Sequence, residues 1–389
     1  MARRAAIVVL DGLGIGAAHD GAAYGDADSN TLGHVLERAG GLALPNLAAL
    51  GLGGCAPLPG MPAPAHPRAA YGTAQPRSAG KDSTTGHWEL CGVVLERPFP
   101  TYPNGFPADV IAEFSRRTGR GVLGNHAASG TEVIDRYGAE HQAGGKWIVY
   151  TSADSVFQVA AHEQTVPLAE LYAACAAARE LLQPPHGVSR VIARPFVGEA
   201  GQYRRTAHRR DFSLPPPGET LLDRLTHAGI GRVGVGKVDD LFAGRGIRST
   251  HTPTNADAYR LIREALDAEG WGFLLANVIE FDQSWGHRND VPGFLGGLAE
   301  LDRELPDLLR GVQTEDLIIF TADHGNDPTT PSTDHARERV PVLVYGPRVR
   351  AVSIGERQTF ADVGQTVAEF LGAAPLAAGT SFLGEVLGG

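Results

Sequence analysis

Cysteine is scarce in this chain of 389 residues. Cys55, Cys91 and Cys175 are an odd number and form no Cys-x-x-Cys pair, which argues against both a disulfide framework and a thiolate zinc site. We therefore expect a protein of a reducing compartment, the cytoplasm.

Long apolar runs and a basic excess are also missing. The run from Ala5 to Leu10 is too short for a signal peptide or a membrane span, and no later stretch approaches about 18 apolar residues. With 34 basic and 44 acidic residues the net charge is -10, which argues against a nucleic-acid surface. We expect a soluble protein without nucleic-acid or membrane partners. Nothing in the sequence indicates a protein partner, and phosphate-sized ligands stay compatible with this charge.

Prolines divide a chain that is long for a single hydrophobic core. Pro98, Pro100, Pro103 and Pro107 interrupt regular structure, and residues 215–218 interrupt it again. Such breaks are typical of domain crossings. The sequence thus predicts an α/β core from residues 1–96 and 213–389, with a smaller inserted α/β cap from residues 97–212.

Acidic residues and histidines follow the predicted strands of the core. Three apolar runs, 5–10, 273–279 and 317–320, each lead into an acidic segment, and a fourth run at 340–345 is preceded by an Asp-His pair. The candidate ligands at these places are Asp11, Asp282, His287, Asp323, His324 and His335. Parallel strands bring their carboxyl ends to one sheet edge. A single Asp-His pair is usually a cap or a satisfied polar pair. Three strand ends that each carry such residues together favour a site for two divalent metal ions.

A hydroxyl-rich segment, residues 81–89, supplies a candidate nucleophile, Thr85. A threonine hydroxyl reacts only when a base or a metal ion activates it. Taken alone, the Thr-Thr-Gly run is more typical of a capped helix start or a turn than of a catalytic site. Its combination with the metal-type ligands favours the catalytic interpretation.

Arginines are concentrated in the predicted cap. Arg194 is expected directly after a strand at 190–193, and four more follow between residues 204 and 210. Arginine binds phosphate oxygens with two parallel hydrogen bonds. We therefore expect phosphate contact from members of this group.

Taken together, these motifs resemble the alkaline phosphatase superfamily and, within it, the phosphopentomutase family. The segments that carry the resemblance are 11–14, 85–89, 282–287, 323–325 and 333–335 in the core, with 150–158, 193–198 and 236–242 in agreement. The resemblance implies an alkaline-phosphatase-like core, in which a largely parallel sheet is flanked by helices.

The resemblance also implies roles for individual residues. Thr85 would be phosphorylated, Asp11, Asp323 and His324 would hold one manganese ion, and Asp282, His287 and His335 would hold a second. The pentose phosphate would contact Ser152, Val156, Arg194, Arg209 and Lys237.

The implied reaction is an isomerisation, the interconversion of ribose or deoxyribose 1-phosphate with the 5-phosphate. It would run by intermolecular phosphoryl transfer through a phosphothreonine and a 1,5-bisphosphate, with a sugar bisphosphate as activator. Three alternatives stay open at this point: a cofactor-independent phosphoglycerate mutase, a plain metal-dependent phosphatase, and a metal-stabilised binding protein. A binding protein has no need of a hydroxyl group beside two metal ions.

Overall fold

The computed structural model describes residues 3–40, 42–152 and 154–387. The chain divides into two compact units, unit 1 (Met1–Pro98 and Pro216–Gly389) and unit 2 (Phe99–Pro215). Unit 2 is thus a single insertion into unit 1. It reaches past residue 212, where the sequence predicted its end, because β8 continues its pairing with β6 to Ser213.

Unit 1 is built on an eight-stranded sheet with the order β10-β9-β11-β1-β12-β13-β2-β14. The strands are β1 (Arg4–Leu10), β2 (Ala70–Ala74), β9 (Arg232–Val235), β10 (Ser249–Thr250), β11 (Phe273–Val278), β12 (Asp316–Thr321), β13 (Val340–Tyr345) and β14 (Ser353–Arg357). Neighbouring strands are parallel except where β13 pairs with β12 and β2. The largely parallel sheet predicted from the sequence is confirmed.

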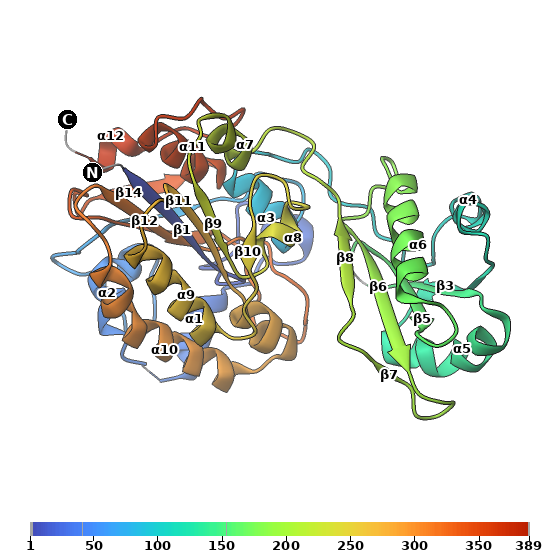
Figure 1. Ribbon diagram of the computed structural model, residues 1–389. Coiled ribbons are helices and arrows are strands. Elements are labelled where there is room, and N and C mark those ends of the chain that lie inside the picture. The colour runs from blue at the N-terminus through green and yellow to red at the C-terminus, as the bar shows by residue number, and fades with distance from the viewer. Residues whose placement is uncertain (1–2, 41, 153, 388–389) are drawn as a thin grey trace. The chain divides into compact units, whose positions relative to one another are not determined.

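Helices cover both faces of this sheet (Figure 1). They are α1 (Thr31–Arg38), α2 (Pro45–Leu50), α3 (Ser83–Leu90), α7 (Leu221–His227), α8 (Val238–Leu241), α9 (Asn255–Asp267), α10 (Val291–Arg310), α11 (Ala361–Phe370) and α12 (Leu383–Val386). Helices α1, α2, α9 and α10 form one layer, while α3, α7, α8 and α11 lie together on the opposite face. Because β1, β11 and β12 are covered on both sides, their side chains are buried without alternation.

Unit 2 has a sheet of its own, in the order β3-β4-β5-β6-β7, with β8 also pairing with β6. Its elements are β3 (Val122–Ala127), β4 (Trp147–Thr151), β5 (Val156–His162), β6 (Arg190–Val197), β7 (Arg204–Arg205), β8 (Arg210–Ser213), α4 (Ala108–Thr118), α5 (Gly130–Gly144) and α6 (Leu168–Leu181). Two apolar clusters, one involving α4 and α6 and the other α5, give this unit an independent core.

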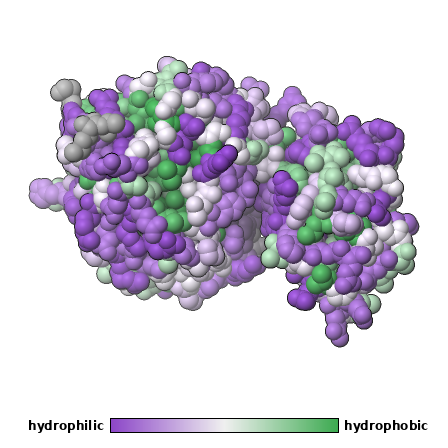
Figure 2. All heavy atoms as spheres, viewed as in Figure 1, coloured by the Kyte–Doolittle hydropathy of each residue, from purple (hydrophilic) through white to green (hydrophobic). Residues whose placement is uncertain are grey.

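The surface of each unit that is visible in Figure 2 is mostly hydrophilic, with hydrophobic residues in small patches. Among the described residues, no helix combines the length and the apolar character that a bilayer crossing requires.

A buried carboxylate anchors α3 to two loops of unit 1. Glu89 is 1% exposed and accepts hydrogen bonds from the backbone of Arg77 and Ser78, at 2.8 and 2.6 Å, and of Phe360, at 3.0 Å. Its Oε1 also accepts from the Thr359 hydroxyl, at 2.6 Å. The helix that carries the candidate nucleophile is therefore fixed by its last turn.

We predict that Glu89→Gln lowers the free energy of unfolding by about 3 kcal/mol, since an amide nitrogen would face backbone donors that now bind a charged oxygen. Urea denaturation measures this change. The matched control is Glu96→Gln, at an exposed position of the same unit, which should change the free energy by less than about 0.5 kcal/mol. Equal stabilities of the two variants would contradict the anchoring role.

Candidate active site

Three carboxylates meet at one edge of the unit 1 sheet. Strand β1 lies between β11 and β12 and is parallel to both, so the three strands end on the same side. Asp11 follows β1 directly, and Asp323 follows β12. Asp282 lies in a π-helical turn, Phe281–Trp285, that comes after β11. All three side chains are buried. The sequence-based expectation of a shared edge matches this arrangement.

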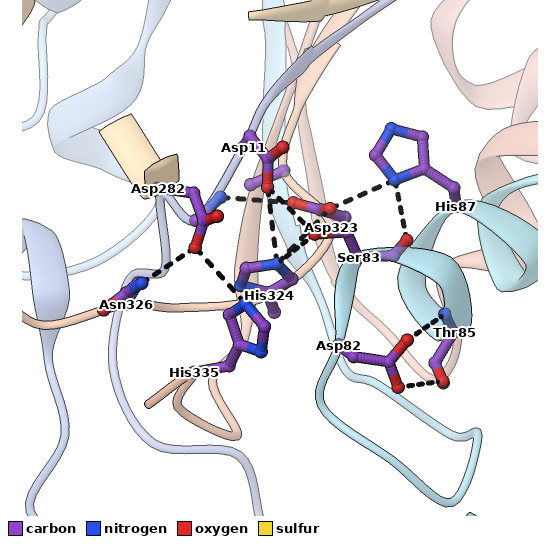
Figure 3. Close-up of polar contacts among 12 residues, drawn as sticks. Asp11, Asp82, Ser83, Thr85, His87, Asp282, Asp323, His324, Asn326 and His335 are labelled. Atoms are coloured by element: carbon purple, nitrogen blue, oxygen red, sulfur yellow. Dashed lines mark hydrogen bonds and ion pairs between the residues drawn. The ribbon is translucent and has the colours of Figure 1, made fainter. Parts of the chain in front are cut away.

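His335 reaches the same edge from the opposite chain direction. Strand β13 is antiparallel to β12, so the segment that enters β13 lies where β12 ends. The His335 ring centroid is 4.2 Å from that of His324 and 4.7 Å from that of His287. The imidazoles of His324 and His335 lie beside the carboxylates of Asp11 and Asp282 (Figure 3).

Among the described residues, three groups of three bring ligand atoms within 4.8 Å of one another, and two of these groups lie at this edge of the sheet. One consists of Asp282, His287 and His335, with Asp282 3.3 Å from His287 Nε2 and 3.4 Å from His335 Nε2. This is the set that the resemblance implies for one metal ion. The other consists of Asp11, Asp282 and His324, so Asp282 stands between the two sets.

Asp323 lies at the margin of the second set. Its Oδ2 is 3.5 Å from His324 Nε2 and is buried without a hydrogen bond among the described residues. A carboxylate oxygen that is buried and unbonded is unfavourable unless a cation fills the place of the missing donor. The donor set of carboxylates and imidazoles therefore fits divalent metal ions.

Mutual attraction controls the charges of this cluster. Burial alone would raise the pKa of the Asp11 carboxyl, but Lys237 and His324 hold it well below its usual range. Burial opposes protonation of His324, yet the carboxylates of Asp323, Asp11 and Asp282 raise its pKa to about 10. His287 behaves alike, because the hydrogen bond and charge of Asp282 outweigh burial and raise its pKa to about 9.

The hydroxyl that contacts this cluster belongs to Ser83 and not to Thr85. Ser83 Oγ lies 3.1 Å from His324 Nε2 and 3.4 Å from Asp11 Oδ1. Thr85 Oγ1 instead donates to Asp82 Oδ2 at 2.5 Å, and the Thr85 backbone N–H donates to Asp82 Oδ1 at 3.1 Å. Figure 3 shows this pair apart from the carboxylates and imidazoles.

Helix geometry separates the two hydroxyl groups. Asp82 caps α3, so Ser83 is its first residue and Thr85 its third. Two residues along a helix turn a side chain by about 200°, so the side chains of Ser83 and Thr85 leave α3 on different sides. Thr85 nevertheless lines a cavity together with Asp323 and His324.

Of the five residues expected to contact the pentose phosphate, Lys237 belongs to unit 1. Its Nζ lies 3.5 Å from Asp11 Oδ2. Ser152, Val156, Arg194 and Arg209 belong to unit 2.

The sequence predicted that Arg194 directly follows a strand. Arg194 instead lies within β6, because this strand continues to Val197. The parallel pairing with β5 extends through Arg194 to Phe196, which keeps the chain extended past residue 193. The Arg194 Nε donates to Gln158 Oε1 at 3.0 Å. Burial, together with the charges of Arg209 and Arg205, lowers the pKa of Arg194 to about 10. Arg209 binds the Asp211 carboxylate through two hydrogen bonds of 2.7 Å.

Three polar residues around the carboxylates were not identified from the sequence. Asn326 Nδ2 donates to Asp282 Oδ1 at 2.8 Å, Asn277 Nδ2 donates to Asp11 Oδ2 at 3.0 Å, and His87 Nδ1 lies 3.0 Å from Asp323 Oδ2. Asn277 carried a usable signal, because an amide inside the apolar run 273–279 is expected only where it has a specific partner.

Comparison with known proteins gives this site a family. The metalloenzyme superfamily model matches residues 3–375. A phosphopentomutase of Caldanaerobacter subterraneus subsp. tengcongensis is 51% identical over 388 residues, which is 99% of this chain and 98% of that protein. A phosphopentomutase of an Anaeromyxobacter species is 53% identical, over 99% of this chain and 100% of that protein. The chain belongs to the phosphopentomutase family.

Membership in the phosphopentomutase family makes this protein an enzyme, an isomerase of the mutase type that uses divalent metal. Among solved structures, phosphoglycerate mutase of Leishmania mexicana is similar, with a TM-score of 0.50 and 14% identity over 98% of this chain and 97% of that chain. A protein of Pyrococcus horikoshii has a TM-score of 0.51 and 16% identity, over 97% of this chain and 100% of that chain. At these identities the likeness extends to the fold alone.

We predict that metal binding releases protons. With pKa values of about 10 and 9, His324 and His287 are protonated at pH 7.5 in the metal-free chain, and an imidazole must be neutral to bind a metal. The apparent affinity for metal should therefore rise as the pH is raised from 7 towards 9. Calorimetric titration in two buffers of different ionisation enthalpy should detect up to about two protons released per chain.

The control for this titration is His287→Ala, which removes one of the two imidazolium groups and should lower the number of protons released by about one. Identical heats in the two buffers for the unmodified protein would contradict the prediction.

Proposed function

We propose that the chain interconverts ribose 1-phosphate, or deoxyribose 1-phosphate, with the corresponding 5-phosphate by phosphoryl transfer between molecules. The names of the relatives support the substrate class. The observation that carries the mechanism is a hydroxyl group held by a carboxylate beside the ligand cluster. Thr85 Oγ1 donates to Asp82 Oδ2 at 2.5 Å, and Thr85 lines a cavity together with Asp323 and His324.

Thr85 is the proposed phosphoryl acceptor. Its hydroxyl donates to Asp82 Oδ2, and an adjacent base of this kind is what activates a hydroxyl nucleophile. Thr85 also lies in the first turn of α3, where unpaired backbone N–H groups favour an added phosphoryl group. The covalent intermediate is accordingly a phosphothreonine, and Ser83 is the alternative acceptor.

Two divalent ions, best supplied as manganese, complete the proposed site. Asp282, His287 and His335 would hold one, and Asp11, Asp323 and His324 the other, with Asp282 close enough to contribute to both. Imidazole combined with carboxylate suits manganese better than magnesium, which prefers oxygen ligands and water. When bound, such ions lower the pKa of a hydroxyl group and neutralise charge on a transferring phosphoryl group.

The reaction then has two balanced halves. Phosphorylated Thr85 gives its phosphoryl group to the free hydroxyl of a pentose monophosphate, whose proton goes to Thr85 Oγ1, and a 1,5-bisphosphate forms. The bisphosphate presents its other phosphate, which returns to Thr85 as the proton moves to the sugar oxygen. A sugar bisphosphate activates unphosphorylated enzyme by entering at the second half.

Five residues are the proposed substrate contacts. Unit 2 carries Ser152, Val156, Arg194 and Arg209, and unit 1 carries Lys237. Binding energy gained from a phosphate that is not reacting can be used to position the one that reacts. Excluding water during transfer separates a mutase from a phosphatase, because water is the competing acceptor.

The acceptor is tested by a pair of variants. Thr85→Val should reduce mutase activity by at least about a thousandfold, because it removes the nucleophile, while Ser83→Ala should retain measurable turnover. Intact mass after exposure to ribose 1,5-bisphosphate should show one added phosphoryl group in the Ser83→Ala protein and none in the Thr85→Val protein. The opposite pattern, with Ser83→Ala inactive and unphosphorylated, would move the role to Ser83.

The intermolecular route is tested with isotope. Label on the phosphate of one ribose 5-phosphate molecule should appear on the sugars of other molecules, and unphosphorylated enzyme should show a lag that catalytic ribose 1,5-bisphosphate removes. Strictly intramolecular retention of the label would refute the route.

Arg194→Ala tests the contribution of unit 2. Loss of this guanidinium should lower mutase activity and raise the fraction of phosphate that is released to water. The matched control is Arg116→Ala, an exposed arginine of unit 2 paired with Glu113, which should leave that fraction unchanged.

A further inference from the structure

We propose that His87 and Asn277 form a positioning pair that fixes Asp11 and Asp323 in the geometry required for metal binding and ties both to the backbone of Ser83. The inference rests on the metal site of the proposed function. Neither residue belongs to the metal-ligand sets described above.

Asn277 is held between two acceptors. It lies in β11 and is fully buried. Its Nδ2 donates to Asp11 Oδ2 at 3.0 Å and lies 3.2 Å from His87 Nε2, while its Oδ1 makes no hydrogen bond with the described residues. A buried amide oxygen without a partner is unfavourable. Packing alone therefore does not account for an amide side chain at this buried position, whereas the two contacts made by its nitrogen do.

These contacts determine the tautomer of His87. The reverse orientation of the Asn277 amide would point its oxygen at the Asp11 carboxylate, so the amide nitrogen must face both acceptors. His87 Nε2 then accepts a hydrogen bond and carries no proton. The N–H group of the imidazole is then the one at Nδ1.

The Nδ1 proton faces the other half of the site. His87 Nδ1 lies 2.9 Å from Ser83 O and 3.0 Å from Asp323 Oδ2, and Figure 3 shows the imidazole beside both. The N–H group donates to the Ser83 carbonyl group. Its positive end lies beside Asp323 Oδ2 and attracts that oxygen, which limits rotation of the carboxylate and leaves its lone pairs available to a metal ion.

One continuous series of contacts results, from Asp11 through Asn277 and His87 to Asp323 and Ser83. Its components are nine-tenths buried or more, apart from Ser83, which leaves little freedom for any carboxylate to rotate. Groups that orient metal ligands in this way typically change metal affinity about 10- to 100-fold when they are removed.

The experiment titrates metal-free full-length protein with Mn²⁺ and detects the free ion by electron paramagnetic resonance, without substrate. His87→Gln places an amide near the position of Nε2 but offers no donor at that of Nδ1. We expect this variant to bind Mn²⁺ about tenfold or more weakly at the site of Asp11, Asp323 and His324. The affinity of the site of Asp282, His287 and His335 should change by less than about threefold. Asn277→Leu, of similar volume, should weaken the same site from the opposite end of the series.

Rescue and control variants separate positioning from packing. His87→Asn carries an amide donor close to the place of Nδ1, and we expect it to recover most of the affinity lost in His87→Gln. His162→Gln is the matched control, because His162 is equally buried but belongs to the core of unit 2, and its affinities should equal those of the unmodified protein.

Unmodified affinity at both sites in His87→Gln and in Asn277→Leu would overturn the inference. Equal weakening of both sites would also overturn it, since that indicates a general loss of structure. Circular dichroism shows whether each variant is folded. If His87→Gln is not folded, the Mn²⁺ affinities of Asn277→Leu alone decide whether the inference holds. Because the measurement contains no sugar phosphate, it can succeed when the mutase assay fails, and the two proposals are tested separately.

Discussion

Negative charge concentrated at one edge of a parallel sheet is the constraint on which this molecule depends. Asp11, Asp282 and Asp323 are buried together, and like charges repel strongly where water is excluded. Their stability requires positive charge from elsewhere in the fold. Lys237 and the imidazoles contribute part of it, and divalent cations are suited to contribute the remainder. Cations gathered by these carboxylates would also attract a phosphoryl group, which is why the proposed reaction is assigned to this edge.

Much of this edge was predictable because continuous apolar runs identify buried parallel strands. The acids at the exits of β1, β11 and β12 meet because those strands are neighbours. His335 was also predicted correctly to lie near them, although β13 runs in the opposite direction. The entry to an antiparallel strand lies beside the exits of its neighbours, so the residues that precede it reach the same place.

What the sequence could not specify depends on orientation and on distant contacts. The motif around residue 85 contains several hydroxyl groups, and only the rotation of α3 about its axis decides that Ser83 faces Asp11. The end of β6 depends on the length of its partner β5, which carried the strand past Arg194. The contact between His87 and Asn277 joins a helix and a strand that are remote in the chain, so local pattern carried no information about the pair.

The insertion of unit 2 also fixes the order in which the two units can be completed during synthesis. Every strand of the unit 2 sheet is present once Ser213 has left the ribosome, and its core is contained in one continuous segment. The sheet of unit 1 cannot close at that stage, because Ala5 pairs with Phe273 and with Leu317. Strand β1, which lies at the centre of the edge that carries the three carboxylates, is thus among the first segments made, yet both of its neighbours are translated only after the whole of unit 2.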